Sequence, residues 1–324
     1  MAQKPRLIIL TGTTASGKSA FLYQSLHDLP LAIINADSRQ VYRDLRISSA
    51  SPGSAELGLF YHELYNFLPL DAVYSAGTFV ADARQAIARS LAQGRIPVVC
   101  GGTYFYIQSL LDGLLPAIPV PETIRAQVEE MSEAEAWQKF NAIDPVAAAR
   151  VHQHNRVRLN RQLMLCLAHG GPISSIARAG GIADEFEILM LVFAPQREVL
   201  RERVSSRLKQ MFAAGMVGEA DAVVRSALAA GLDWHTLPAL TGIGTSEFFD
   251  AYASTGLLPA ELNTEQLASV EQSIITNTMQ LVKRQMTWFR NSSAKQPFTK
   301  TVDPSYEHEL IAALARDFMQ VRVQ

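Results

Sequence analysis

The sequence predicts an α/β fold: a P-loop parallel sheet with flanking helices, interrupted by an all-helical insertion domain. Two observations lead to this prediction. Up to about residue 115, and again from about residue 186, short apolar runs alternate with amphipathic helical patterns, as in parallel sheets. From 116 to 185 helical patterns continue without strands. We therefore expect a core in two parts, 1–115 and 186–324, with the insertion at 116–185 between them.

The first expected strand leads into a glycine-rich loop. The apolar run Leu7–Leu10 stands just before this loop, and a helical pattern follows it over 20–26. Glycine lets successive backbone N–H groups point inward, and the helix N-terminus adds positive charge, so the loop should hold phosphate groups. Lys18 supplies a mobile cation, and the Ser19 hydroxyl is the candidate Mg²⁺ ligand. The expected phosphate-binding residues are Gly12, Thr13, Thr14, Ala15, Ser16, Gly17, Lys18 and Ser19.

Two further strands of the first part end at polar residues. The run Leu31–Ile34 is too short for a helix and leads to Asp37, and the run Ile96–Cys100 leads to Gly101, Gly102 and Thr103. A helix is expected between them over 78–93. In parallel sheets ligands bind at the carboxyl ends of the strands, so the phosphate loop, Asp37 and Thr103 should lie at one edge.

The remaining elements complete the two-part organisation. Three prolines make a stiff entry to the insertion, which ends in the glycine-rich segment 179–181. A strand at 186–193 and a helix at 197–214 then resume the core, and two further helices are expected at 264–291 and 305–321.

Composition limits the class of protein. The 324 residues are 48% hydrophobic and 19% charged, an ordinary globular composition, and the net charge of −2 does not indicate a nucleic-acid binder. Basic residues nevertheless gather at 150–161, 197–209 and 283–290. Cys100 and Cys166 form no CxxC pair, so neither a disulfide framework nor a zinc site is expected. The first apolar run is too short for a signal core or membrane span, and we expect a cytoplasmic protein.

Asp37 is the one acidic residue at a strand end near the loop, and its role can be interpreted in two ways. It could help hold a metal ion in a nucleotide-hydrolysing or kinase site, or it could act as a general base toward an acceptor. The adjacent Ser38, Arg39 and Gln40 supply hydrogen-bonding groups, which favours an acceptor. The third expected strand ends in Gly101-Gly102-Thr103 and brings no second carboxylate.

At this point the chain resembles a known family. The loop Gly12–Ser19, the segment 37–43 (Asp-Ser-Arg-Gln-Val-Tyr-Arg), the segment 101–106 and the segment 283–290 (Lys-Arg-Gln-Met-Thr-Trp-Phe-Arg) stand in the order and spacing of the tRNA dimethylallyltransferases. The similarity covers most of the chain. Four motifs at these intervals are more specific than a P-loop alone.

The resemblance implies transfer of a dimethylallyl group from dimethylallyl diphosphate to N6 of the adenine at tRNA position 37, with Mg²⁺ and as a monomer. Lys18 and Mg²⁺ held through Ser19 would take up charge on the leaving diphosphate. Asp37 would be the general base, and Arg207, with Arg203 as a weaker candidate, would reach the diphosphate. The expected catalytic residues are thus Asp37, Lys18, Thr103 and Arg207.

The adenine must leave its stack to reach such a pocket, so the enzyme should flip it out of the anticodon arm. The resemblance makes the insertion an anticodon-arm clamp. It implies tRNA contacts from Asp37, Ser38, Arg39, Gln40, Thr103, Arg125, Val157, Arg158, Leu159, Asn160 and Arg161. Thr103 could instead be only a helix cap, and Trp288 and Phe289 are expected in the core rather than stacked on a base.

Several positions depart from the family pattern, and alternatives stay open. Ser51 replaces a lysine of the family pattern, Arg156 an aspartate, Thr245 a tyrosine and Met279 an arginine, so we expect tRNA affinity to be affected more than chemistry. The alternatives are a P-loop kinase of a small metabolite and a catalytically weakened tRNA-binding relative. The P-loop itself does not distinguish a prenyl diphosphate from ATP, so nucleotide binding is also expected to be possible.

Overall fold

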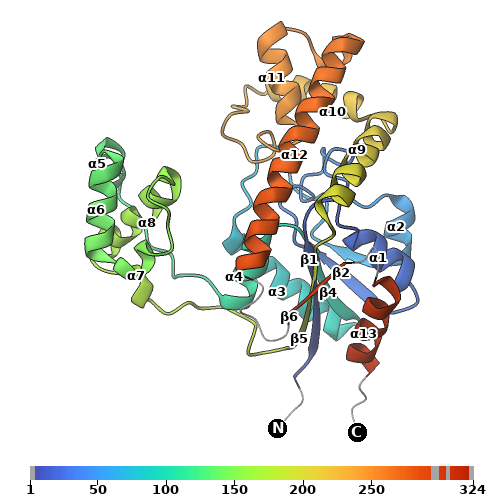
Figure 1. Ribbon diagram of the computed structural model, residues 1–324, viewed down its shortest axis with the longest axis horizontal. Coiled ribbons are helices and arrows are strands. Elements are labelled where there is room, and N and C mark those ends of the chain that lie inside the picture. The colour runs from blue at the N-terminus through green and yellow to red at the C-terminus, as the bar shows by residue number, and fades with distance from the viewer. Residues whose placement is uncertain (1–3, 293–298, 304–306, 321–324) are drawn as a thin grey trace. The chain divides into compact units, whose positions relative to one another are not determined.

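The computed structural model describes residues 4–292, 299–303 and 307–320 (Figure 1). The chain divides into two compact units. One consists of Met1–Leu110 and Ala183–Gln324 and is called the core unit below; the other, Leu111–Ile182, is called the helical unit.

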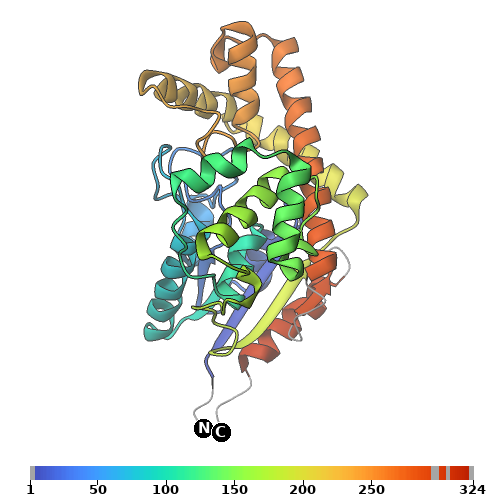
Figure 2. The same cartoon turned by 90° about the vertical axis from the view of Figure 1, so that its left-hand side faces the viewer.

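The core unit contains a six-stranded sheet in which every pair of neighbouring strands is parallel. Figure 2 shows β1 and β5 side by side, as their pairing requires. In spatial order the strands are β3 (Tyr61–Glu63), β2 (Leu31–Asn35), β4 (Ile96–Gly101), β1 (Arg6–Gly12), β5 (Glu187–Phe193) and β6 (Thr299–Val302). The predicted parallel α/β sheet is confirmed.

The four inner strands are the four that the sequence predicts, because each is a continuous apolar run buried on both faces of the sheet. The edge strands β3 and β6 were not predicted. They have three and four residues, Tyr-His-Glu and Thr-Lys-Thr-Val, and none of these residues is fully buried. Short, polar edge strands carry no apolar run from which they could be recognised.

Helices cover the sheet and extend beyond it. Predicted and observed bounds agree within a few residues for α3, α9 and α12; the predicted helix 305–321 corresponds to α13, and residues 305, 306 and 321 lie outside the described residues. The α-helices that begin in the core unit are α1 (Lys18–Ser25), α2 (Ser54–Leu59), α3 (Ala76–Ala92), α4 (Tyr104–Asp112), α9 (Arg197–Ala213), α10 (Met216–Ala229), α11 (Ser246–Thr255), α12 (Thr264–Ser292) and α13 (His308–Gln320), and a 3-10 turn spans Pro259–Glu261.

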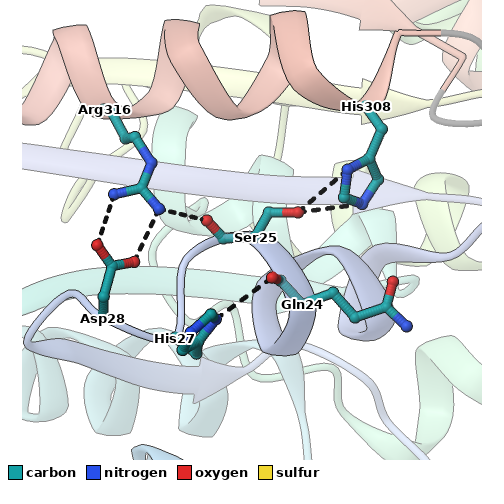
Figure 3. A network of polar contacts seen from close by, with 6 residues as sticks. All are labelled: Gln24, Ser25, His27, Asp28, His308 and Arg316. Atoms are coloured by element: carbon teal, nitrogen blue, oxygen red, sulfur yellow. Dashed lines mark hydrogen bonds and ion pairs between the residues drawn. The ribbon is translucent and has the colours of Figure 1, made fainter.

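The C-terminal helix α13 is docked on the helix that follows the phosphate loop. Arg316 donates to both carboxylate oxygens of Asp28, each at 2.7 Å, and to the Ser25 carbonyl at 2.7 Å, while the His308 ring lies 3.0 Å from Ser25 Oγ (Figure 3). Ile311 of α13 is fully buried in the same apolar cluster as strands β1 and β5. This end of the chain therefore helps to fix α1 against the sheet.

The helical unit has a hydrophobic core of its own. Its helices α5 (Glu122–Glu130), α6 (Glu133–Ile143), α7 (Pro145–Ala148) and α8 (Arg156–His169) are followed by a 3-10 turn, Ile173–Ser175. Figure 2 shows α5, α6 and α8 packed together, with Val128, Phe140 and Leu159 fully buried between them.

Two polar side chains hold this unit together. Asp144 accepts from the Ala147 N–H at 2.9 Å and from the N–H and hydroxyl of Ser174 at 2.8 and 2.6 Å. These bonds lower the pKa of Asp144 against the opposing, largest effect of burial. Arg156, where the resemblance leads us to expect an aspartate, donates from Nη2 to the carbonyls of Val128 and Met131 at the C-terminal end of α5. A cation suits that helix end, so the departure at Arg156 has a structural role here.

No helix in the described part of the chain combines the length and the apolar composition that a membrane crossing requires.

Candidate functional site

The phosphate loop joins β1 to α1, and its glycines are required by close contacts. Gly12 has φ of +146°, and a Cβ there would lie 2.2 Å from the carbonyl oxygen of Phe193. Gly17 caps α1 with φ of +94°, a conformation that side chains rarely adopt. The predicted loop geometry therefore depends on glycine at both ends.

Lys18 reaches back over this loop. Its Nζ donates to the carbonyls of Gly12 at 3.2 Å and Thr13 at 2.7 Å and to Ser16 Oγ at 3.3 Å. Burial lowers the pKa of Lys18 to about 8, against the attraction of Asp37. Among the described residues no carboxylate bonds to Lys18 Nζ, so this ammonium group is available to an incoming anion. Arg203 donates to the Ser16 carbonyl at 3.2 Å and so braces the same loop.

The loop opens into a cavity of about 620 Å³ that lies within the core unit. This volume is sufficient for a small-molecule ligand. Arg207 of α9 lines it, and burial lowers the pKa of this guanidinium while Asp37 acts in the opposite direction. Of the expected site residues, Thr14, Ala15, Lys18, Ser19, Asp37, Ser38, Arg39, Gln40, Thr103 and Arg207 line this cavity.

Asp37 follows β2 and is held by its own turn. Its N–H donates to Asn35 Oδ1 at 2.8 Å, and its Oδ1 accepts from the Arg39 N–H at 2.9 Å. Oδ2 makes no hydrogen bond within the described residues and lies 3.6 Å from where a Cβ on Gly102 would stand. The turn therefore fixes the carboxylate and leaves one oxygen available to a ligand.

Thr103 connects two of the strand-end loops. Its Oγ1 accepts from the Ser38 N–H at 2.9 Å and donates to Ser38 Oγ at 3.2 Å. Thr103 also stands directly before α4, with its carbonyl accepting from the Ile107 N–H at 3.4 Å, but its hydroxyl bonds to the β2 loop, so it is more than a simple helix cap.

Arg39 and Gln40 support the cavity wall. A Cβ on Gly242 would lie 2.8 Å from Arg39 Cζ, so the guanidinium packs directly on that glycine, and burial lowers the pKa of Arg39. Gln40 Nε2 donates to the carbonyls of Ser49 and Ala50 at 3.1 and 2.8 Å, which holds the segment after Leu45 in place.

Two groups that sequence reasoning missed organise the site from the second half of the chain. Gln285 of α12 accepts from the Thr14 N–H at 3.0 Å through Oε1 and donates from Nε2 to the Gly102 carbonyl at 3.1 Å. It therefore links the phosphate loop to the loop after β4. Its place within the Lys-Arg-Gln motif was the only signal, and the partners, 271 and 183 residues away, could not be read from it.

The second such group is Glu247, which is only 4% exposed. It accepts from the Gly244 N–H at 2.8 Å, from Ser246 Oγ at 3.2 Å and from Asn277 Nδ2 at 2.8 Å. These bonds tie the 241–245 segment of the cavity wall to α12. The buried Thr245 is the N-cap residue of α11 and lines the same cavity.

The other expected tRNA-contacting residues all belong to the helical unit. Val157 is 84% exposed, Arg158 and Arg161 are exposed, and Arg125 pairs with Glu122 at 3.2 Å on the surface of α5. Leu159 is fully buried in the core of this unit, so its side chain packs the fold and is not available to RNA. Asn160 is half-buried.

The side chains that line the cavity supply too few ligands to hold a metal ion alone, but they can hold one together with the phosphates of a substrate. The described residues include no group of three or more His, Cys, Asp and Glu side chains that could hold a metal. Ser19 offers a hydroxyl, and among the described residues Asp37 is the only carboxylate lining the cavity. Mg²⁺ suits such a site, because it keeps several waters and binds one or two protein oxygens together with substrate phosphates.

The two aromatic residues of α12 take different positions. Phe289 is 4% exposed, as expected for a core residue, whereas Trp288 is half-buried; both line the cavity and contact Tyr104.

Residues 40–292 match the family described as IPP transferase. The matched range includes Thr103, Arg207 and Gln285. It begins after the phosphate loop and Asp37, so the roles of those residues are argued from their geometry alone. It covers more than half of the chain, and the resemblance seen in the sequence is thereby confirmed.

Three solved structures have the same fold. A tRNA isopentenylpyrophosphate transferase from Bacillus halodurans is 24% identical, with a TM-score of 0.66, over 98% of this chain and 97% of that one. A eukaryotic dimethylallyltransferase acting on tRNA is 22% identical, with a TM-score of 0.80, over 98% and 80%. A tRNA delta(2)-isopentenylpyrophosphate transferase from Staphylococcus epidermidis is 24% identical, with a TM-score of 0.61, over 97% and 99%.

Proposed function

Because the chain belongs to the IPP transferase family, we propose that it transfers the dimethylallyl group of dimethylallyl diphosphate to N6 of the adenine at tRNA position 37 and releases diphosphate. One observation carries the proposal: a phosphate loop and a carboxylate with a free oxygen line the same cavity. A phosphate site next to a single base suits a reaction in which diphosphate leaves and an amine attacks.

The phosphate loop binds the diphosphate of the donor. The diphosphate oxygens replace the Gly12 and Thr13 carbonyls as hydrogen-bond acceptors of Lys18 Nζ. Arg207 of α9 adds a second cation to the site. Ser19 Oγ would hold Mg²⁺, which would supply further positive charge to the leaving group when bound. As the C–O bond breaks, its electron pair goes to the diphosphate, where the charges of Lys18 and Arg207 stabilise it.

The adenine enters the cavity as an extruded base. Its N6 lone pair is delocalised into the ring, so attack on the allylic carbon is helped by a base. Asp37 Oδ2 accepts the N6 proton as the new N–C bond forms, while the Arg39 N–H holds the other carboxylate oxygen in place. Ser38 and Thr103, which bond to each other, line the same cavity as Asp37 and orient the base.

The helical unit provides the second tRNA contact. Arg158 and Arg161 on α8 and Arg125 on α5 are exposed cations suited to backbone phosphates of the anticodon arm. The chain acts as a monomer in the cytoplasm in this proposal. ATP binding by the phosphate loop is not needed for the reaction.

The test is an incubation of the protein with Mg²⁺, labelled dimethylallyl diphosphate and tRNA from a strain that lacks the modification. Label should enter the tRNA, and digestion should release prenylated adenosine. Phosphate transfer from ATP to a small acceptor without any prenyl transfer would contradict the proposal. A tRNA with guanosine in place of adenosine 37 is the matched substrate control.

A further inference from the structure

Three consecutive aromatic residues begin α4, and only two of them are packed. Tyr104 contacts Trp288, and Tyr106 stacks on Phe79 with the ring centroids 4.5 Å apart. Phe105 between them is 60% exposed. Single exposed apolar side chains are common on folded proteins, but among the large apolar side chains exposed in the described residues only Phe105 lines the cavity, which points to a ligand there.

Phe105 stands at the edge of the cavity that contains the reacting groups. It lines this cavity together with the adjacent Thr103 and with two cations, Arg39 and Arg284. Figure 1 shows α4 beside the end of α12 that carries Arg284 and Trp288. An exposed aromatic ring on a cavity whose lining also includes cations is a composition that binds single-stranded nucleic acid, with bases stacked on the ring and phosphates near the charges.

We propose that Phe105 is a stacking platform for the nucleobase next to the adenine that enters the cavity. This inference rests on the proposed function and adds a specific subsite to it. Extrusion of one base from an anticodon loop leaves its neighbour without a stacking partner on that side. A ring at the edge of the cavity replaces the lost partner and keeps the RNA backbone aligned with Asp37.

The exposure of Phe105 favours a nucleobase over the prenyl chain as its partner. A prenyl group is held inside the cavity, where it is protected from water, and would need a buried contact. A base flanking the cavity stays partly in solvent, as the ring does. Stacking is also tolerant of base identity, because every base has a π face.

The experiment measures binding and turnover of an anticodon stem-loop RNA with three variants. Phe105→Ala removes the ring, Phe105→Trp keeps a stacking face, and Phe67→Ala is the matched control. Phe67 is also an exposed aromatic residue, at 41%, and it does not line the cavity. Phe105→Ala should raise the Kd and the KM for RNA roughly 5- to 100-fold, with the KM for dimethylallyl diphosphate unchanged. Phe105→Trp and Phe67→Ala should stay within about twofold of the original chain.

A second RNA locates the partner base. In an RNA with an abasic nucleotide beside the target adenine, the original chain should lose the same affinity that Phe105→Ala loses. When Phe105→Ala is tested with the abasic RNA, the loss of RNA affinity should be no larger than the loss caused by either change alone. Equal Kd values for Phe105→Ala and Phe67→Ala would overturn the inference. It would also be overturned if the losses of affinity from Phe105→Ala and from the abasic nucleotide added fully, whichever side of the adenine the abasic nucleotide stands on.

The two proposals fail in different ways. An absence of prenyl transfer by the unaltered chain would remove the proposed function itself. Normal prenyl transfer by the unaltered chain with unchanged RNA affinity in Phe105→Ala would remove only the stacking platform. Circular dichroism of each variant should match the original chain, since an exposed ring contributes little to the core.

Discussion

Gln285 offers a quantitative test of how the site is assembled. Its amide joins the Thr14 N–H to the Gly102 carbonyl, and therefore holds the phosphate loop against the loop after β4. Gln285→Met has nearly the same shape and removes both hydrogen bonds. At about 0.5–1.5 kcal/mol net for each bond, the loss is about 1–3 kcal/mol. This corresponds to a roughly 5- to 150-fold decrease in the population of the joined arrangement.

Steady-state kinetics with both substrates should show which kinetic constants change when the two hydrogen bonds are lost. Because the phosphate loop is directly affected, the KM for dimethylallyl diphosphate should rise and kcat should fall, while the KM for tRNA changes little. Gln280→Met is the matched control, since Gln280 is an exposed glutamine on the same helix with no bond to either loop. Identical kinetics of the two methionine variants would refute the reasoning.

A charged variant separates positioning from simple packing. In Gln285→Glu the ionised carboxylate can accept from the Thr14 N–H but repels the Gly102 carbonyl. A protonated carboxyl group can donate to that carbonyl and restore the link. The ratio of kcat/KM for Gln285→Glu to that of the original chain should therefore increase as pH falls. A flat ratio would mean that the amide has only a packing role.

Three further changes test other parts of the account. Asp37→Asn should lower kcat by about 10²–10⁴-fold with dimethylallyl diphosphate binding retained in calorimetry, and unchanged turnover would exclude Asp37 as the base. Lys18, with its pKa lowered to about 8, binds fewer protons when folded than when unfolded between about pH 8 and 10.5, so its contribution to stability rises with pH there. At pH 7 the free energy of unfolding in urea should therefore be higher for Lys18→Met than for the original chain, by at most about 3 kcal/mol. This advantage should shrink above pH 8, and a difference in unfolding free energy that does not change with pH would contradict the lowered pKa of Lys18. Gly12→Ala should lose at least about 1–3 kcal/mol, because its Cβ would meet the Phe193 carbonyl at a strained φ, while Gly218→Ala, with nothing within 4 Å, should gain a few tenths of a kcal/mol. Equal unfolding midpoints for these two alanine variants would count against the strained loop.

The sequence was sufficient for those parts of the fold that depend on local pattern. Strands β1, β2, β4 and β5 are apolar runs, and α9 and α12 have clear helical patterns, so each was predicted close to its observed bounds. The phosphate loop was recognisable because its geometry depends on glycines at fixed local positions. Asp37 and Thr103 were expected at one edge of the sheet because parallel strands end together there.

The contacts that complete the site depend on tertiary structure and were not predicted. Gln285 bonds to residues 271 and 183 positions away, and Glu247 to Asn277 of another helix. Burial could also not be assigned within α8, where Val157 is exposed and Leu159 is fully buried two residues later. Such distinctions follow from which face of a helix meets the core of its unit.

Mapping the modified nucleotide tests the central claim most directly. Unmodified tRNA is incubated with the protein, Mg²⁺ and dimethylallyl diphosphate, and the products are digested and analysed by mass spectrometry. The account predicts one added dimethylallyl group, on N6 of adenosine 37, with one diphosphate released for each group transferred. A tRNA that remains unmodified, or a prenyl group on another nucleotide, would contradict it.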